Sequence, residues 1–313
     1  MNSSMTEEVV RRLREGRPLD GLDLGTVEGR WDLRGVVLGS AVPKSIRVAG
    51  RDASVLSGTV ELDGVVLEGL DLAGCDWRNL RLTDVVLRNC VLDGAQLRGL
   101  RVWRVDVADC SFVRADLRDA STGGGTPFWR RRPSRWTRVD FAGADLRGSA
   151  HGDELFTDCS FDHARLDGVD FWGARHVRSR FVGPVREVSF HRYAPGAVLR
   201  NGPGNQMVGV DFSQAQLDGC SFWGLDLAEA ILPEGDQHVI FANKVQVARA
   251  VLADLERQGL GGRLVSLRVI MERVIEEGPN TAVARKVVHR DTLGDSDGER
   301  REAEAFLRSH IGT

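Results

Sequence analysis

A five-residue hydrophobic period is the feature that most constrains how this chain can fold. Central apolar residues recur every five positions from Leu62 to Leu117, and smaller apolar residues recur two places before each of them. In an α-helix, five residues turn the chain by about 500°, so successive apolar side chains would rotate by about 140°. In a β-strand, five is an odd step, so they would alternate between the two faces. A chain that turns a corner in every repeat is the remaining solution, because it can point each apolar pair inward.

The period extends over much of the chain, with interruptions. It is unbroken over residues 60–121 and resumes at Val139 after a gap. Residues 183–209 are degenerate, and a last clean block covers residues 210–232. The other positions of each repeat are mostly Asp, Arg, Gly, Asn and Ser, which suit turns and solvent.

Individual repeats identify a family. The pentapeptides AQLRG, CSFVR and ADLRD, within residues 95–119, resemble the pentapeptide-repeat proteins, whose consensus is A(D/N)LXX. The resemblance implies an all-β solenoid: a right-handed quadrilateral β-helix in which each coil of about 20 residues stacks its central Leu or Phe inside. It extends over residues 19–234, with residues 19–58 as weaker opening coils in which Leu33 and Leu38 are in phase. A C-terminal α-helical extension follows.

Both ends of the chain have a helical pattern instead. Residues 1–18 are predicted to form an N-terminal capping helix over Thr6–Glu15, and residues 235–313 a C-terminal helical region. A stack of coils ends in unpaired strand edges, so both segments are candidates for covering them. The C-terminal region is either a cap alone or a dimerisation or partner-docking element, and the resemblance makes a homodimer one expectation. The first predicted helix carries the apolar residues Phe241, Val245, Ala248, Leu252 and Leu255. The second contains the apolar residues from Leu264 to Val274, and two short helices begin after Asn280 and at Asp297.

The five cysteines all precede a central residue by two places. That position points inward, so we expect buried hydrophobic thiols and no metal site. Cys90 and Cys110 are expected to stack on adjacent coils, where an oxidising compartment would allow a disulfide.

His151 and His176 occupy central positions that Leu or Phe normally holds. Asp153, Glu154 and Asp158 lie near His151 and could supply acid–base chemistry or metal ligands. The alternative is a distorted repeat whose histidine is hydrogen-bonded or solvated. The register places the two histidines on neighbouring faces of successive coils, so no convergent pair is predicted. Without a recognisable catalytic motif, we expect no catalytic residues, no cofactor and no enzyme activity.

Residues 121–138 interrupt the period with a loop rich in glycine, proline, arginine and aromatic residues. Arginine with tryptophan is enriched at protein interfaces and also suits nucleic acid. The alternative is a loop whose rings fold back onto the coil wall. The predicted partner-binding residues are Phe128, Trp129, Arg130, Arg131, Arg132, Arg135 and Trp136.

Three further aromatic residues are candidate surface positions. Trp172 and Trp223 follow central phenylalanines in matching FWGA and FWGL repeats, and this position points outward. They mark either a partner surface or a surface that a loop or helix covers. Tyr193, the one tyrosine, lies beside His191 and Arg192 in the degenerate segment, which is either a degraded coil with bulges or a projecting loop.

The net charge and the family resemblance together limit the possible functions. The chain has a net charge of −3, and residues 60–120 carry 11 acidic and eight basic residues, also −3. This is mildly acidic and falls short of a DNA-like potential. Family members protect or inhibit DNA gyrase, so the resemblance implies a non-enzymatic protein-binding rod with a type II topoisomerase as candidate partner. It also implies DNA mimicry and an antibiotic-resistance or modulating role.

The alternative function is a regulatory or assembly scaffold that binds another protein through the C-terminal helices. Direct nucleic-acid binding stays open. No apolar stretch approaches the length of a membrane span, and the N-terminus lacks an apolar signal core, so a cytoplasmic location is the default expectation.

Overall fold

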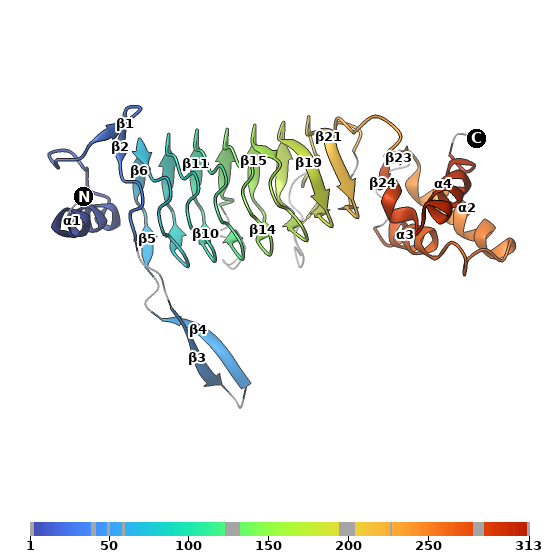
Figure 1. The fold of residues 1–313 in the computed structure, drawn as a ribbon, viewed down its shortest axis with the longest axis horizontal. Helices are drawn as coiled ribbons and strands as arrows, with labels where there is room; N and C mark the ends of the chain where they lie inside the picture. Colours follow the sequence, from blue (N-terminus) through green and yellow to red (C-terminus); the bar gives the residue numbers. More distant parts are fainter. Residues whose placement is uncertain are drawn as a thin grey trace. The chain divides into compact units, whose positions relative to one another are not determined.

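The computed structural model describes residues 3–38, 42–48, 51–57, 60–122, 132–193, 204–225, 227–277 and 285–311. The chain divides into two compact units, Met1–Arg165 and Leu166–Thr313, and the boundary lies inside the repeats (Figure 1). The predicted domain boundary near residue 234 lies inside the second unit, where Leu217 of the coils bonds His238 of the C-terminal segment.

The first unit is a stack of four-sided coils. Strands of equivalent position pair in parallel, as Leu62 pairs with Leu82 and Leu82 with Val102, one coil of 20 residues apart. The first face consists of β5 (Glu61–Asp63), β8 (Arg81–Thr83), β10 (Arg101–Trp103), β12 (Ser121–Thr122) and β14 (Ala150–Gly152). The second face consists of β6 (Val66–Glu68), β9 (Val86–Arg88), β11 (Asp106–Ala108), β13 (Arg135–Thr137) and β15 (Leu155–Thr157).

The other two faces of this unit are held mainly by isolated bridges. The third face includes β7 (Leu70–Asp71) and β16 (Ser160–Asp162), with bridges such as Asp71 to Val91 between them. The fourth face is a ladder of single bridges along Asp76, Gln96, Asp116, Asp145 and Arg165. These parallel ladders confirm the predicted quadrilateral β-helix.

A left-handed residue at each corner explains the five-residue period. Gly64 (φ 67°), Asp84 (φ 52°) and Arg104 (φ 54°) hold the corner between the first and second faces in successive coils. Glycine takes positive φ without strain, and Asp tolerates it. Arg104 lacks that tolerance, but its guanidinium is tied to the Asp84 carboxylate at 2.6 Å.

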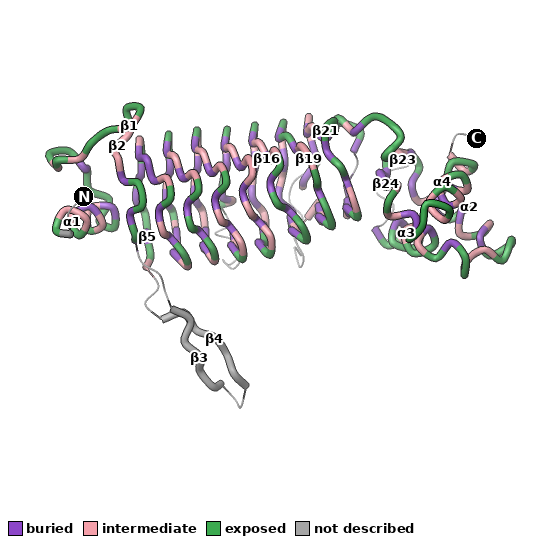
Figure 2. The backbone as a smooth tube through the Cα atoms, in the orientation of Figure 1, coloured by how far each residue is buried: buried purple, intermediate pink, exposed green. Residues whose placement is uncertain are grey.

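The interior of the first unit is mainly apolar, and buried positions recur along its coils in Figure 2. Its early coils are filled by aliphatic side chains and Trp77, which is fully buried. Later coils stack aromatic rings, with Phe112 5.4 Å from Phe141 and Phe141 5.1 Å from Phe161. All five cysteines are free and buried, as the register predicts.

The start of the chain follows the expected weak coils only in part: Leu33 and Leu38 are buried in phase, and Val37 bridges to Asp76 of the following coil. Helix α1 (Ser3–Glu15) buries Val9 and Leu13, and the hairpin β1 (Thr26–Val27) with β2 (Arg30–Asp32) joins β7 in parallel. Strands β3 (Val42–Val48) and β4 (Arg51–Ser57) then pair with each other in antiparallel register. Residues 42–48 and 51–57 are therefore paired strands of a hairpin and not a coil. Two seven-residue strands with a short connection favour this pairing.

The second unit begins with further coils. One parallel face consists of β17 (Asp170–Trp172), β20 (Ser189–His191) and β22 (Ser221–Trp223). The next face holds β18 (Arg175–Val177). On the face after it, β19 (Arg180–Arg186) pairs with β21 (Asp211–Asp218). The register of β19 and β21 shifts after Arg180, which marks a bulge. The part of the degenerate segment that the structure describes is thus a modified coil. Its core is a column of Phe171, Phe190 and Phe222, with adjacent rings 5.3 Å apart.

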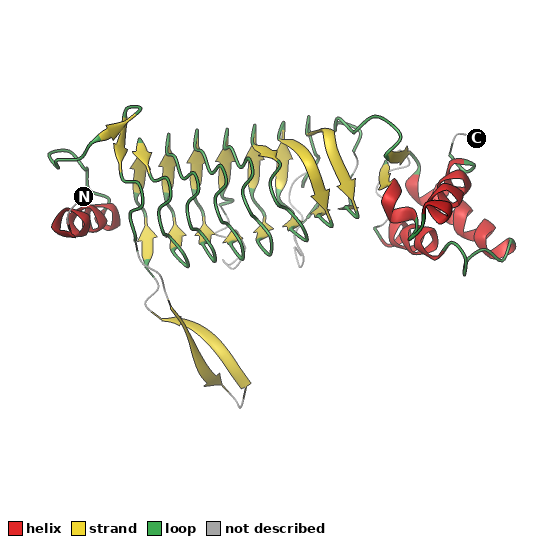
Figure 3. Cartoon of the chain, viewed as in Figure 1, coloured by secondary structure: helices red, strands yellow, loops and turns green. Residues whose placement is uncertain are grey.

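A small helical subdomain ends this unit (Figure 3). It comprises β23 (His238–Phe241), α2 (Lys244–Arg257), α3 (Val265–Glu276), β24 (Lys286–His289), the 3-10 helix η2 (Arg290–Leu293) and α4 (Asp297–Arg308). Strands β23 and β24 are antiparallel, and the backbone N–H of Leu217 in the coil donates to Nε2 of His238 at 3.1 Å. The predicted helix after Asn280 lies outside the described residues. Across the described ranges, every helix is too short or too polar to cross a membrane.

Candidate docking surface

Three rings on the second unit form a continuous surface row. Trp172, His191 and Trp223 each follow a central phenylalanine, in β17, β20 and β22 respectively. The parallel register pairs Phe171 with Phe190, and His191 with Trp223, so the three rings lie one above the other on adjacent coils. We call Trp172, His191 and Trp223 the aromatic ladder.

The geometry of the aromatic ladder combines a stacked pair and an edge contact. The His191 and Trp223 rings are 5.8 Å apart and within 4° of parallel, whereas Trp172 meets His191 at 6.4 Å and 80°. Trp172 is 44% exposed, and the other two rings are partly exposed. Large aromatic side chains are costly to leave in water, so an exposed row of them is typical of an interaction surface.

Asp170 lies against the histidine of the aromatic ladder. Its Oδ1 lies 3.0 Å from Nε2 of His191. Burial raises the pKa of the Asp170 carboxyl and lowers the pKa of His191, and the attraction between the two groups opposes both changes. The lowered pKa keeps His191 largely neutral at pH 7, so the row presents apolar rings with one carboxylate at its side.

Tyr193 lies beside the aromatic ladder. The Arg192 guanidinium lies 5.5 Å from the centre of the Tyr193 ring, and the Arg192 backbone N–H donates to the Trp223 carbonyl oxygen at 2.8 Å. The structure therefore places Trp172 and Trp223 in one row, with Tyr193 two residues after His191 of that row. It adds His191 and Asp170. The signal for His191 was its place directly after central Phe190, the position that tryptophan holds in the FWG repeats.

The predicted partner-binding loop divides into two parts. Phe128, Trp129, Arg130 and Arg131 lie outside the described residues. Arg132 bonds the Asp106 carboxylate at 2.8 Å, and Arg135 is exposed on β13. Trp136 is only 3% exposed and holds a central position in the coil, so its assignment to a docking loop is corrected: it is a core residue.

Trp136 belongs to a buried polar network around Glu154. Glu154 accepts hydrogen bonds from the Trp136 indole at 2.8 Å and the Thr122 hydroxyl at 2.6 Å, and its Oε2 is 2.9 Å from Nδ1 of His151. The other ring nitrogen of His151 is 2.9 Å from the Ser149 hydroxyl. Ser149, His151 and Glu154 have the order of a hydrolase triad, but they are 4%, 5% and 0% exposed, so a substrate has no access.

The second unexpected histidine is also a core residue. His176 is 1% exposed, and its ring makes edge contacts with Phe171 at 4.8 Å and Phe181 at 5.5 Å. Both histidines thus replace a central Leu or Phe inside the coil. In the described parts of the chain, no group of three or more His, Cys, Asp or Glu side chains is placed to hold a metal ion.

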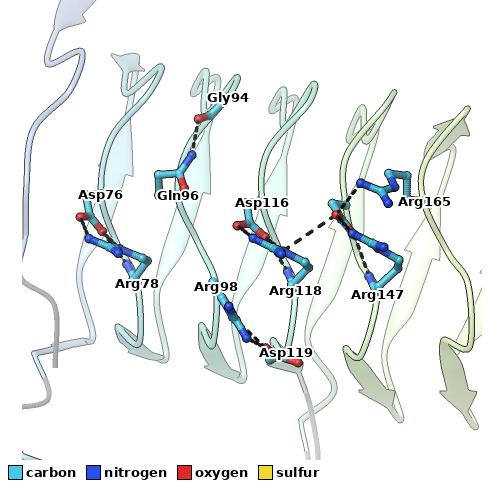
Figure 4. Close-up of polar contacts among 11 residues, drawn as sticks. Asp76, Arg78, Gly94, Gln96, Arg98, Asp116, Arg118, Asp119, Arg147 and Arg165 are labelled. Carbon is cyan, nitrogen blue, oxygen red and sulfur yellow. Dashed lines mark hydrogen bonds and ion pairs between the residues drawn. The ribbon is translucent and has the colours of Figure 1, made fainter. Parts of the chain in front are cut away.

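The fourth face of the first unit carries a ladder of aspartate–arginine pairs (Figure 4). Asp116 and Arg118 make two parallel contacts, of 2.8 and 2.7 Å, and Asp116 also accepts the backbone N–H of Arg118. Where Gln96 replaces the aspartate, Arg98 crosses to Asp119 instead. Equivalent pairs join Asp76 to Arg78 and Asp145 to Arg147.

The arginines lie outside the carboxylates on this face. Arg118 has a side chain 40% exposed against 17% for Asp116, and Arg78 49% against 20% for Asp76. A surface that resembles DNA needs unpaired negative charge at its outside. On this face the outer layer is cationic, so the fourth face does not support the DNA-mimicry prediction.

The residues predicted as a docking helix lie mostly inside the helical subdomain. Ala248 and Leu255 are buried in its core with Val251, Leu267 and Met271. Phe241 is buried too, but it ends β23 and is not part of the helix. Because Val245 and Leu252 are also partly buried, the predicted docking face is corrected to an internal packing face.

The exposed apolar side chains of the subdomain lie elsewhere. Val265 is 42% and Val269 51% exposed, one turn apart on α3. Their spacing of four residues places them on the same side of that helix.

Comparisons with known proteins agree with the coil. A family model described as pentapeptide repeats matches eight copies, over residues 61–100 and 206–234. A trypsin-treated form of QnrB1, a plasmid-mediated fluoroquinolone resistance protein, is 16% identical with a TM-score of 0.40, covering 57% of this chain and 86% of that one. HetL, involved in heterocyst differentiation regulation in Nostoc sp. strain PCC 7120, is 17% identical with a TM-score of 0.27, covering 57% and 94%. These low scores carry no argument about partners, and no curated protein matches the sequence.

Proposed function

Because this chain is a pentapeptide-repeat protein, we propose that it is a non-enzymatic protein-binding solenoid whose docking surface is the aromatic ladder. The observation that carries the proposal is Trp172, which is 44% exposed at the end of a row of stacked rings. Tryptophan, tyrosine and arginine are the residues on which protein interfaces most often depend. Tyr193 and Arg192 beside the row supply the other two.

The candidate partner is a type II DNA topoisomerase, with protection or modulation of that enzyme as the biological role. The repeat family supports this choice. The charge of the fourth face favours contacts with protein over imitation of DNA, because arginines cover its carboxylates. A cytoplasmic location fits this role and remains part of the proposal.

The test measures gyrase binding and supercoiling with the full chain, with and without a quinolone. Trp172→Ala should weaken binding by about tenfold or more, because it removes an exposed anchor and leaves the core intact. Trp103→Ala is the matched control, since Trp103 follows central Val102 in the same repeat position but packs under Arg81 at 5.4 Å. No binding, no inhibition and no protection at micromolar protein rejects the topoisomerase partner.

A second function is an assembly scaffold or homodimer built through the helical subdomain. The observation that favours it is the exposed Val265 and Val269 pair on α3. Val269→Glu should then abolish self-association or partner binding while Trp172→Ala leaves it unchanged. Sedimentation of both variants distinguishes the two surfaces.

A further inference from the structure

Two of the five buried cysteines lie directly against each other. Cys90 and Cys110 hold the same position in consecutive coils of the first unit, and the backbone N–H of Cys90 donates to the Cys110 sulfur at 3.4 Å. We propose that these two residues form an intramolecular disulfide when the protein meets hydrogen peroxide. The inference goes beyond the proposed function and does not depend on the docking surface, because it concerns a separate site in the first unit.

The backbone of the two coils holds these cysteines at a separation that a disulfide can span. The Ser111 N–H donates to the Cys90 carbonyl oxygen at 3.0 Å, and Val91 bridges to Ser111, so the coils are in register at this point. Paired strands lie about 4.8 Å apart, and a disulfide joins Cα atoms that are about 4.4–6.8 Å apart. The pair can therefore close without a change of register.

The structure describes all five cysteines, and no other two of them stand on adjacent coils. The coil after Cys110 places Val139 at this position, and Cys159 follows one coil later. Two strand spacings of about 4.8 Å put Cys159 beyond the limit of about 7 Å between bridged Cα atoms. The remaining two cysteines stack on aliphatic residues: Cys75 on Ala95 and Cys220 on Val188.

Cys90 is the nucleophile of the pair. Its side-chain hydrogen bond with Cys110 lowers the pKa of the Cys90 thiol, because that bond stabilises the thiolate. Burial instead raises the pKa of Cys159 and of Cys220 to about 12, so those thiols stay protonated. The thiolate is the form of cysteine that attacks a peroxide.

The reaction takes place in two steps. The Cys90 thiolate attacks one oxygen of hydrogen peroxide, the O–O bond breaks, and hydroxide leaves and takes up the thiol proton to form water. Cys90 is then a sulfenic acid. The Cys110 sulfur attacks the sulfenic sulfur, the S–S bond forms, and the S–O bond breaks to release a second water with the Cys110 proton. Two thiols are thus oxidised to one disulfide, and one peroxide is reduced to two waters.

The burial of the pair selects a small oxidant. Cys90 is 1% and Cys110 3% exposed, so the folded coil closes both sulfurs to large thiol reagents. Hydrogen peroxide is small and uncharged, and local opening of the coil admits it. The product links two consecutive coils, so the oxidised protein has a more stable first unit.

The test treats the full chain with a small excess of hydrogen peroxide, removes the peroxide with catalase and alkylates the denatured protein. Five alkylated thiols are expected before treatment and, with two lost, three after it. Trypsin should release one cross-linked pair of peptides, since Arg98 and Arg104 lie between Cys90 and Cys110. The oxidised chain should melt at least about 5 °C higher, because the link restricts the unfolded chain, and dithiothreitol should reverse this shift.

Two alanine variants provide the comparison. Alanine fills the same repeat position at Ala95 and Ala115, so the coil accepts it there. Cys110→Ala should give no cross-linked peptides and no rise in melting temperature after peroxide. Cys159→Ala also removes one buried cysteine but leaves the pair intact, so it should retain both effects.

Several outcomes overturn the proposal. Five alkylated thiols after peroxide mean that the oxidant does not reach the pair. Sulfinic or sulfonic acid at Cys90 without a cross-link means that Cys110 does not resolve the sulfenic acid. A cross-link that contains another cysteine, or a dimer that dithiothreitol splits, assigns the disulfide to a different pair or to two chains.

Discussion

The Trp136 indole donates a 2.8 Å hydrogen bond to Glu154 Oε1 inside the coil, where both side chains are almost completely buried. Trp136 is the first central residue after the insertion that follows Thr122, and Thr122 bonds the other oxygen of Glu154. One carboxylate thus ties together the coil positions on either side of the insertion.

Replacement of Glu154 should destabilise the protein strongly. Glu154→Ala leaves the donors of Trp136 and Thr122 buried and unpaired, which is expected to lower the free energy of unfolding by about 3 kcal/mol. Glu68→Ala, at an exposed position of β6, should change it by less than about 0.5 kcal/mol. Urea denaturation of both variants measures the difference, and equal effects would contradict the role of the network.

Two buried tryptophans should respond differently to the same change. Trp77 is fully buried, and its indole nitrogen has no hydrogen-bond partner in the described part of the chain. Trp77→Phe removes this unpaired group, which offsets the lost apolar area, so we expect a change within about 1 kcal/mol. Trp136→Phe removes the indole donor of the buried Glu154 Oε1 and should cost about 2 kcal/mol more. Thermal and urea melts of the pair test this order.

The aspartate–arginine ladder predicts a loss of stability in acid. Arg118 lowers the pKa of the Asp116 carboxyl below its usual 3.8 in the folded state, chiefly through a side-chain hydrogen bond. The stabilisation is therefore fully present above about pH 4 and is lost as the pH falls through the lowered folded-state pKa. Asp116→Asn should reduce this part of the acid dependence. Arg118→Gln should do the same, because it removes the cause; unchanged profiles of unfolding free energy below pH 4 would contradict the assignment.

His238 predicts a second, separate acid response. Burial, with a smaller effect of nearby His289, lowers the pKa of His238 from 6.5 to about 4. The folded state requires the neutral ring, so stability is complete above pH 6.5 and falls as the pH drops toward 4. The slope should reach at most about 1.4 kcal/mol per pH unit. This pH dependence should disappear in His238→Leu and persist in His163→Ala, which changes a residue at an exposed corner. The measurement is the free energy of unfolding between about pH 4 and pH 6.5.

The fold follows from sequence because its rule is local. Each repeat needs an inward pair and a corner residue, and both can be read within five positions, as at Leu62 and Gly64. Trp136 was misassigned because the arginine and aromatic residues around it suggest a loop, although it lies five residues before the central Phe141 and is therefore in phase with the resumed period. The pairing of Val107 with Trp136 confirms this register.

The sequence predicts only part of the candidate docking surface. Trp172 and Trp223 are marked by their FWG repeats, but the coil between them departs from the five-residue step, since Val185 follows Phe181 by four. The stacking of His191 between the two tryptophans therefore depends on a bulge in β19 and on an insertion after Tyr193. The sequence marks residues 183–209 as degenerate, but it gives neither the position of the bulge nor the register beyond it.

The coil register also determines which insertions and deletions preserve the fold. Removal or duplication of residues 82–101 would join equivalent corners, because Leu82 and Val102 are direct strand partners. Gain or loss of a single repeat would instead turn the following residues by about a quarter turn, moving Arg118 to a different face from Arg78. Insertions and deletions in such a gene are therefore tolerated in whole coils, or as extra residues at a corner, and rarely in between.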